Sequence, residues 1–333
     1  MSETALPRPR NIDVDALRGW AITLVVLGHA IQVATPHFDQ NVIFRLIYSF
    51  HMPLFMAISG YLAFGKVEGR FTRVLTRKAP QLLVPFACWA VISFLVSPVE
   101  RSIGAARFAM QLLISPDYGL WFLPVLFLEF LFLSAVTSLA PKRHVIAFLL
   151  LGAIALKFTP TSVLGLGLAK MYFPYFAGGW AVRQMGIDRR FRASMWVGPV
   201  SLMVFLIAAT FWTRTSPPSW LSHTDGRTQQ LLWDVYRYGT ATAGIAASSW
   251  LLPTLLAFQR SLRTALEWIG GRTIDVYATH GYFLTISTAA ALILPRPAVI
   301  AVSFTVALSG ALALSALVLR RFAITQRLLL GKT

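Results

Sequence analysis

Long apolar runs, separated by short polar segments, alternate along almost the whole of the 333-residue chain. A helix needs about 20 consecutive apolar residues to cross the hydrocarbon core of a bilayer. Runs near this length recur throughout, so the pattern predicts membrane-spanning helices. Ten can be drawn, at about 17–35, 41–64, 80–97, 119–140, 144–158, 163–183, 195–212, 231–258, 273–294 and 298–319. We therefore expect an all-α integral membrane protein, a bundle of about ten transmembrane helices.

The composition supports this class and explains the strong positive charge. Hydrophobic residues make up 56% of the chain and charged residues only 13%, whereas a soluble domain carries about 25% charged residues. The net charge of +17 comes from lysines and arginines that gather in alternate polar segments. Cytoplasmic loops of membrane proteins carry such an excess. We therefore expect the lipid bilayer as a partner, and no nucleic acid.

The same alternation orients the chain with both termini in the cytoplasm, as a multi-pass protein of the cell (inner) membrane. In that orientation the opposite side holds few basic residues: Arg101, Arg107, Lys157, Arg214, Arg227 and Arg296. Residues 1–10 are then a cytoplasmic tail, 11–320 the membrane domain and 321–333 a basic cytoplasmic tail. The polar head has no cleavage-like site, so the first apolar run is expected to stay as an anchor.

The first apolar run carries a cation and an imidazole on one face. Arg18 and His29 are eleven positions apart, which is almost three helical turns and about 16 Å along the axis. A lone histidine in an apolar helix is more often a structural hydrogen-bonding group, but this alignment favours a functional site, with Asp15 placed to orient Arg18. The next run contains His51 just before Pro53, which removes a backbone N–H and is expected to open the helix there.

Ionisable residues recur inside the predicted spans. They are His29, Arg45, His51, Glu129, Lys170, Asp234, Arg237, Asp275 and His280. Such groups are costly in lipid and normally face a cavity or a partner. Asp234 and Arg237, three positions apart, could pair with each other, but the number of such groups predicts a polar cavity within the bundle.

The predicted orientation sorts these groups by depth. Asp15, Arg18 and Asp275 fall near the cytoplasmic face, with His280 somewhat deeper. Four residues fall in the outer half: Arg45, Lys170, Asp234 and Arg237. Between the two groups lie His29, His51 and Glu129. We therefore expect a cavity that is accessible from both sides of the membrane, with histidines at its midpoint.

Several common catalytic patterns are absent from the sequence. The single cysteine, Cys88, allows no internal disulfide. No GxSxG, no HExxH and no metal-spaced Cys/His cluster is present, so we expect no metal site. The pair Ser59–Gly60 favours close helix–helix contact over a nucleophilic serine.

The motifs together resemble acyltransferase family 3 of integral membrane proteins. The R-x10-H signature spans Arg18 to His29 within DALRGWAITLVVLGH. FHMPLFMAISGYL resembles the branch of fucose 4-O-acetylase-like and surface-polysaccharide acetyltransferases. Later family segments are similar to LWFLPVLF, which contains Trp121, to YFPYFAGGWAVR and to GRTIDVYATHGYFL. The resemblance covers about residues 10–320, and one departure is IDVYATH, where the family pattern is closer to SLxIYLLH.

The resemblance implies transfer of an acyl group, commonly acetyl, from cytoplasmic acyl-CoA to a hydroxyl of a glycan or a lipid-linked oligosaccharide. No permanently bound cofactor is implied, because acetyl-CoA is a substrate. A homo-oligomer or a polysaccharide-assembly complex is compatible with this class. Arg18, with Asp15 and Asp275, is expected to bind the donor, since a guanidinium suits phosphate. His29 either takes the proton of the attacking hydroxyl or briefly holds the acyl group.

The remaining candidates are assigned to the reacting carbonyl or to the acceptor. His51 and His280 are expected to polarise the thioester carbonyl or stabilise the oxyanion. The acceptor is expected to bind at Arg45, Glu129, Lys170, Asp234, Arg237 and Trp121. A glycan or lipid transporter without transfer chemistry is the alternative, because transporters also hold polar sites at the midplane. The sequence leaves open the acceptor and the choice between acetyl and succinyl donors.

Overall fold

The computed structural model describes residues 12–66, 71–114, 120–160, 163–188, 191, 194–287 and 294–332. Regular structure in these residues is helical, without a strand. The expected all-α class is therefore confirmed for the described part of the chain. The predicted N-terminal tail, 1–10, lies outside it.

Six helical segments in the described residues are long and apolar enough to cross a membrane. They are Asp13–Ala34, Val42–Ala63, Phe71–Val96, Phe122–Leu139, Gly226–Phe258 and Arg296–Leu319. Three shorter apolar helices are α7 (Ala105–Ile114), α9 (Val145–Phe158) and α12 (Val197–Thr210). The chain is thus a multi-pass membrane protein, and the count of ten spans stays a prediction.

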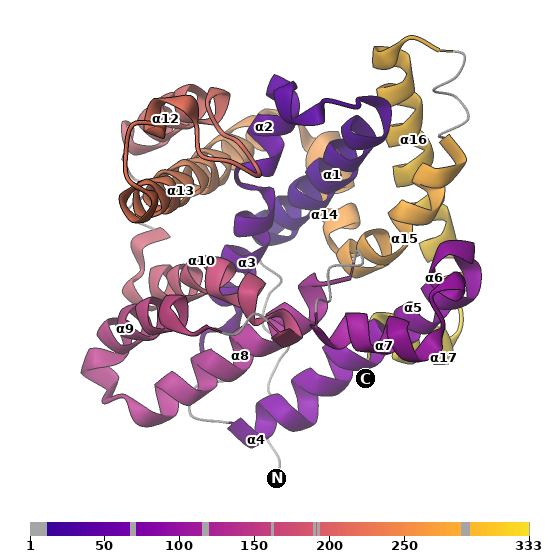
Figure 1. Cartoon of the computed structure of the whole chain (residues 1–333), viewed down its shortest axis with the longest axis horizontal. Helices are drawn as coiled ribbons and strands as arrows, with labels where there is room; N and C mark the ends of the chain where they lie inside the picture. The colour runs from indigo at the N-terminus through magenta and orange to yellow at the C-terminus, as the bar shows by residue number, and fades with distance from the viewer. Residues whose placement is uncertain are drawn as a thin grey trace.

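The first helix, α1 (Ile12–Ala34), lies at the centre of the fold (Figure 1). It packs against α3 (His51–Ala63), α14 (Arg260–Gly270), α15 (Thr273–Ser287) and α16 (Arg296–Leu314). Glycines allow the closest approach: a Cβ built on Gly19 would lie 2.0 Å from the carbonyl oxygen of Leu266. One on Gly270 would lie 1.9 Å from that of Asp15. The amphipathic α14 was not expected from the hydropathy pattern, since it is too short and polar to span.

A second close contact joins α3 to α10 (Leu166–Met185). A Cβ on Gly60 would lie 1.8 Å from the carbonyl oxygen of Phe176, and one on Gly179 would lie 1.9 Å from that of Ala57. The predicted helix contact at Gly60 is therefore confirmed. Helices α8 (Phe122–Leu139) and α9 pack against α10 in turn. Helix α13 (Gly226–Phe258) pairs with α12 (Figure 1) and contacts α9 through the ion pair of Asp234 with Lys157.

The helix that was predicted over 41–64 is broken in two. Helix α2 (Val42–Tyr48) ends before Ser49, and α3 starts at His51 after Phe50 leaves helical geometry. Pro53 therefore stands in the first turn of α3, where its missing N–H leaves no intrahelical hydrogen bond unmade. This break sets His51 at the very start of a helix in the middle of the bundle.

The remaining described elements lie at the rim. Helices α4 (Phe71–Arg73) and α5 (Ala79–Val96) are joined by a π-helical turn, Val74–Lys78. Between the predicted spans 80–97 and 119–140 the chain forms α6 (Pro98–Ser102) and α7. A second π-helical turn, Ser315–Leu319, ends the α16 segment, and α17 (Ala323–Leu330) packs back against α5.

Candidate active site

A polar cavity of about 880 Å³ lies inside the bundle, and His29, His51 and His280 line it. They come from the last third of α1, the start of α3 and the middle of α15. Nδ1 of His29 lies 3.2 Å from Nε2 of His280, and the two ring centroids are 5.1 Å apart. The fold thus joins two imidazoles that are far apart in the sequence.

Backbone hydrogen bonds decide which ring nitrogens carry protons. Nδ1 of His280 lies 2.9 Å from the carbonyl oxygen of Val276, which can only accept, so this nitrogen carries the proton. In the neutral ring Nε2 is then an acceptor, and it receives the Nδ1–H of His29. The lone pair of His29 is consequently left on its Nε2. His51 follows the same pattern, because its Nδ1 donates to the carbonyl of Ile47 at 2.8 Å.

Tyr48 and Arg214, which the sequence did not single out, also line the cavity. The Tyr48 ring lies edge-on to His51, with centroids 4.7 Å apart, and its hydroxyl donates to Gln32 Oε1 at 2.7 Å. The Arg214 guanidinium lies 5.8 Å from the centre of the Tyr48 ring. Gln32 and Tyr48 each stand three positions from a histidine in the sequence, and for Gln32 this is about one turn of α1, a spacing that could have identified it.

An aromatic wall faces the histidines across the same cavity. Trp121, at the start of α8, stacks on Tyr172 of α10 with centroids 5.1 Å apart and planes 18° from parallel. The backbone N–H of Phe122 donates to the Tyr277 hydroxyl at 3.1 Å, which ties the start of α8 to α15. Of the predicted acceptor-binding residues, Trp121 and Arg237 are therefore the two that the cavity brings together with the histidines.

Arg237 reaches this cavity between two tryptophans. Its guanidinium lies 5.0 Å from the centre of the Trp233 ring and 5.8 Å from that of Trp212. Its Nε has no hydrogen-bond partner among the described residues. Asp234, the alternative partner expected three positions earlier, pairs instead with Lys157 at 2.9 Å. The guanidinium of Arg237 is therefore held by aromatic faces and not by a carboxylate of its own helix.

Three further acceptor candidates are not among the cavity-lining residues. Arg45 donates to the carbonyl oxygens of Asp39 at 2.6 Å and Thr210 at 2.8 Å, which ties α2 to the end of α12. Lys170 donates to the carbonyl of Thr159. Glu129 is fully buried in α8, and neither of its carboxylate oxygens has a hydrogen-bond partner in the described part of the chain.

The predicted donor-binding residues lie outside the lining of the histidine cavity as well. Nη1 of Arg18 is 3.4 Å from Oδ1 of Asp15, one turn earlier on α1. Asp275 is buried and accepts hydrogen bonds from Arg320, at 2.6 Å from its Nε, and from Ser315. Among the described residues, no group of three or more potential metal ligands comes together.

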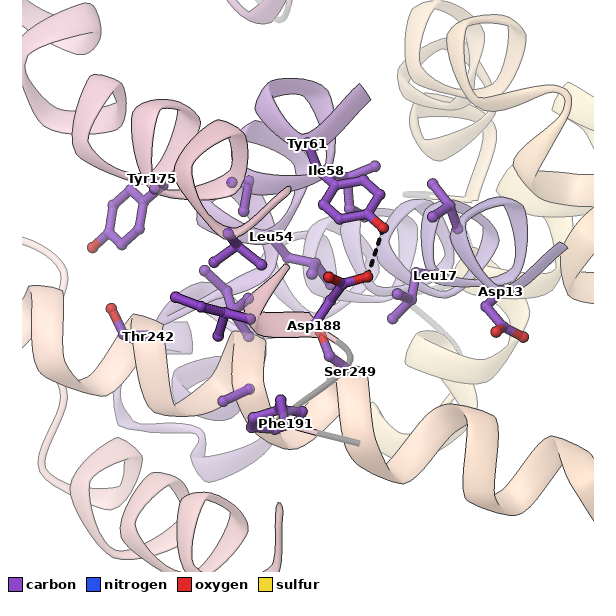
Figure 2. Close-up of a pocket in the computed structure, with 18 of the residues that line it drawn as sticks. Asp13, Leu17, Leu54, Ile58, Tyr61, Tyr175, Asp188, Phe191, Thr242 and Ser249 are labelled. Carbon is purple, nitrogen blue, oxygen red and sulfur yellow. Dashed lines mark hydrogen bonds between the residues drawn. The ribbon is translucent and has the colours of Figure 1, made fainter. Parts of the chain in front are cut away.

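A second, largely apolar cavity of about 330 Å³ lies between α1, α3, α10 and α13 (Figure 2). Leu17, Leu54 and Ile58 are among its apolar walls. On its rim the Tyr61 hydroxyl donates to Oδ2 of Asp188 at 2.9 Å, the dashed line in Figure 2. Tyr175 lines both cavities, so its ring is a shared wall between the apolar cavity and the histidine cavity.

The sequence of the chain is similar to those of known proteins. Residues 11–320 match the model of acyltransferase family 3, described as an acyltransferase domain. The chain is 31% identical over 185 residues to the nodulation protein NolL of Mesorhizobium japonicum, covering 53% of this chain and 48% of that protein. It is 46% identical over 88 residues to NolL of Sinorhizobium fredii, covering 25% and 24%. No solved structure matches the chain significantly.

The chain therefore spans about half the length, or less, of these curated relatives. The family match is much longer, since it takes in both Arg18 and His280 and ends only at residue 320. With several helices able to span a membrane, the match also fits the class predicted from the sequence. The chain belongs to acyltransferase family 3, a family of integral membrane acyltransferases.

Proposed function

We propose that this protein transfers an acyl group, acetyl in the first instance, from acyl-CoA to a hydroxyl of a glycan or its lipid-linked precursor. The observation that carries the proposal is the contact between His29 and His280 inside a cavity wide enough for a substrate. A buried, oriented imidazole pair offers a base whose proton-accepting nitrogen is defined, as general-base catalysis requires.

His29 acts as the general base. Its Nε2 takes the proton of the acceptor hydroxyl while that oxygen attacks the thioester carbonyl. The new C–O bond forms, the C–S bond breaks, and the proton is returned to the leaving thiolate of CoA. When His29 is protonated, its Nδ1–H bond to His280 becomes a charge-assisted one, so His280 stabilises the imidazolium. His280 is in this scheme a positioning residue.

Arg214 is the candidate for stabilising the tetrahedral oxyanion. In their neutral forms His51 and His280 keep their Nδ1 protons on backbone carbonyls, so they have no second N–H to offer the oxyanion. Arg214 lines the same cavity and carries several donors. A cation positioned beside the reacting carbonyl stabilises the negative charge that develops there. This role replaces the one that was expected for the two histidines.

The aromatic wall suits a sugar acceptor. Trp121 and Tyr172 present flat apolar rings, and Arg237 supplies directed donors beside them. Binding sites of small molecules commonly combine such aromatic surface with a few polar groups that fix orientation. We place the acceptor against this wall, with its reacting hydroxyl towards His29.

The two substrates approach from opposite ends of α1. Arg18 stands near the first turns of α1, about 16 Å from His29 along the axis, so a donor held at that end can reach the histidines with an extended arm. With ten spans, both termini in the cytoplasm and the chain in the inner membrane, this end is the cytoplasmic one. The acceptor then enters from the outer side, where Arg45 and Arg214 lie.

Incorporation of label separates this enzyme from a carrier. Purified protein in vesicles is given acetyl-CoA labelled in the acetyl group together with a glycan acceptor, and ester-linked label on the acceptor is counted. The enzyme produces an alkali-labile acetyl ester at a rate that depends on both substrates. A carrier moves unmodified glycan across the vesicle membrane and leaves the acceptor unlabelled, which would overturn the proposal.

A further inference from the structure

A cluster of basic side chains surrounds the start of α15. It consists of Arg272, Arg320 and Lys332, with Asp275 in their midst, and we refer to it as the basic corner. The residues come from the junction of α14 and α15, the end of the α16 segment and the end of α17. Arg320 Nη2 donates to the carbonyl of Gly271 at 2.5 Å, so its guanidinium lies beside Arg272, and Lys332 is near enough to feel the charges of Arg320, Asp275 and Arg272. Three cations thus share one carboxylate.

Both carboxylate oxygens of Asp275 already accept hydrogen bonds. Asp275 is 2% exposed, and its Oδ2 accepts from Arg320 Nε at 2.6 Å and from Ser315 Oγ at 2.5 Å. Its Oδ1 accepts from Arg320 Nη2 at 3.0 Å, which completes a bidentate pair. Asp275 therefore neutralises Arg320 and fixes its orientation, and it has little capacity left for the other two cations.

The other two cations of the basic corner are Arg272 and Lys332. No carboxylate lies within ion-pair distance of either in the described part of the chain, and Nε of Arg272 has no hydrogen-bond partner there. The Arg272 guanidinium is held flat over the Trp268 ring, 3.7 Å from its centre. Burial lowers the pKa of Lys332, and the nearby charges of Arg320 and Arg272 lower it further, whereas Asp275 opposes the shift.

The neighbouring carboxylates form ion pairs with other arginines. Glu267, one turn before the end of α14, pairs with Arg263 at 3.0 Å, and Asp15 pairs with Arg18. The positive end of the α15 helix dipole, at Thr273, adds to the cationic character of this corner. Like charges that a fold holds together favour a bound anion, because the anion removes their repulsion.

The basic corner also lies in the right place for the donor. Gly270 packs against the backbone of Asp15 and Gly19, so the part of α1 that carries Arg18 adjoins the α14–α15 junction. Arg272 and His280 are eight positions apart across the start of α15, about 12 Å along the axis. A phosphate at the corner and a thioester at the histidines can therefore belong to one extended molecule.

We propose that the basic corner binds phosphate groups of the CoA donor through Arg272, Arg320 and Lys332, with Asp275 as the residue that positions Arg320. This inference rests on the proposed function, and it moves the role of Asp275 from direct contact with the donor to support of a cation. Phosphates of anionic lipid headgroups share the same chemistry, and they are the other source that the experiment must separate.

The test measures equilibrium binding of CoA and of 3′-dephospho-CoA to the purified full chain carrying His29→Ala, so that no turnover occurs. Arg272→Gln and Lys332→Gln should each weaken CoA binding about tenfold, the value expected for one charge-assisted hydrogen bond. Arg321→Gln is the matched control, because Arg321 is exposed and adjacent to Arg320, whereas it is Arg320 that pairs with Asp275. Its affinity for CoA should be unchanged.

Unchanged CoA affinity in both variants would overturn the proposal. Lys332 follows the end of α17 and is exposed, so its variant tests the idea even where Arg272→Gln fails to fold. The measurement is repeated in nanodiscs of phosphatidylcholine with and without phosphatidylglycerol. Stabilisation by phosphatidylglycerol that Arg272→Gln abolishes, with CoA affinity unaltered, would assign the site to lipid. Full turnover by the His29→Ala protein would instead refute the proposed mechanism and leave the binding result standing.

Discussion

Replacing His280 should reveal how much the second imidazole contributes to the base. In the proposed mechanism its Nε2, 3.2 Å from Nδ1 of His29, gains a charge-assisted hydrogen bond as His29 is protonated in the transition state. The bond already exists in the resting state, so only its strengthening on protonation, about 1–1.5 kcal/mol, lowers the barrier, which corresponds to a loss of about 5- to 12-fold in kcat. His280→Leu should therefore lower kcat by this factor and leave KM for both substrates nearly unchanged.

A conservative variant distinguishes this role from a purely structural one. His280→Gln places a carbonyl acceptor close to the position of Nε2 and should recover part of the lost rate. If His280 had only a structural role, restoring an acceptor would not restore the rate. The assay is initial-rate kinetics with labelled acetyl-CoA, compared at equal amounts of folded protein. Equal losses in His280→Leu and His280→Gln, or a rise in KM without a change in kcat, would refute the assigned role.

Three other predictions test the packing, the oxyanion and the acceptor wall. Gly179→Ala should lower the yield of folded protein, because its Cβ would lie 1.9 Å from a carbonyl oxygen of α3, whereas Gly178→Ala, with open space around it, should not. Arg214→Ala should lower kcat about 10²–10³-fold as measured by initial rates, whereas Arg227→Ala, in the first turn of α13, should leave kcat intact; equal effects would contradict the oxyanion role. Trp121→Ala should raise KM for the glycan several-fold without altering CoA affinity, and a loss of CoA affinity instead would place the donor at this wall.

The helical class and the family could be predicted from the sequence because they depend on local signals. A run of apolar residues gives a helix of spanning length, and the interval from Arg18 to His29 fixes one face of α1. The cost of burying ionisable groups in lipid also pointed to a polar cavity. The structure places His51 and His280 in the same cavity as His29, while their chemical roles stay predictions.

Partners that come from distant elements could not be predicted. Arg45 hydrogen-bonds to Thr210, which is 165 positions away, and Asp275 pairs with Arg320 across two helices. Arg214 stands in a connector rich in turn formers, where composition indicates a solvated loop and gives no sign of a cavity wall. These contacts depend on how helices are arranged in three dimensions, which hydropathy does not encode.

The positions of the helix breaks could be predicted only in part. Pro53 indicated a disturbance near His51, but the break falls ahead of it, at Ser49 and Phe50, because proline is tolerated in a first helical turn. The amphipathic α14 was hidden between two apolar segments, although it carries the contact with Gly19 that fixes α1. Short polar helices give weak signals beside long apolar ones.

The role of His29 is tested most directly by one pair of measurements on His29→Ala: acyl-CoA affinity and transfer rate. The variant removes the only Nε2 lone pair assigned to the base, so transfer should fall at least about 10²–10⁴-fold. Affinity for acyl-CoA should stay near that of the unaltered protein, as it should in His144→Ala, an exposed histidine that serves as the control. Wild-type turnover in His29→Ala at normal expression would contradict the mechanism and make His51 the next candidate for the base.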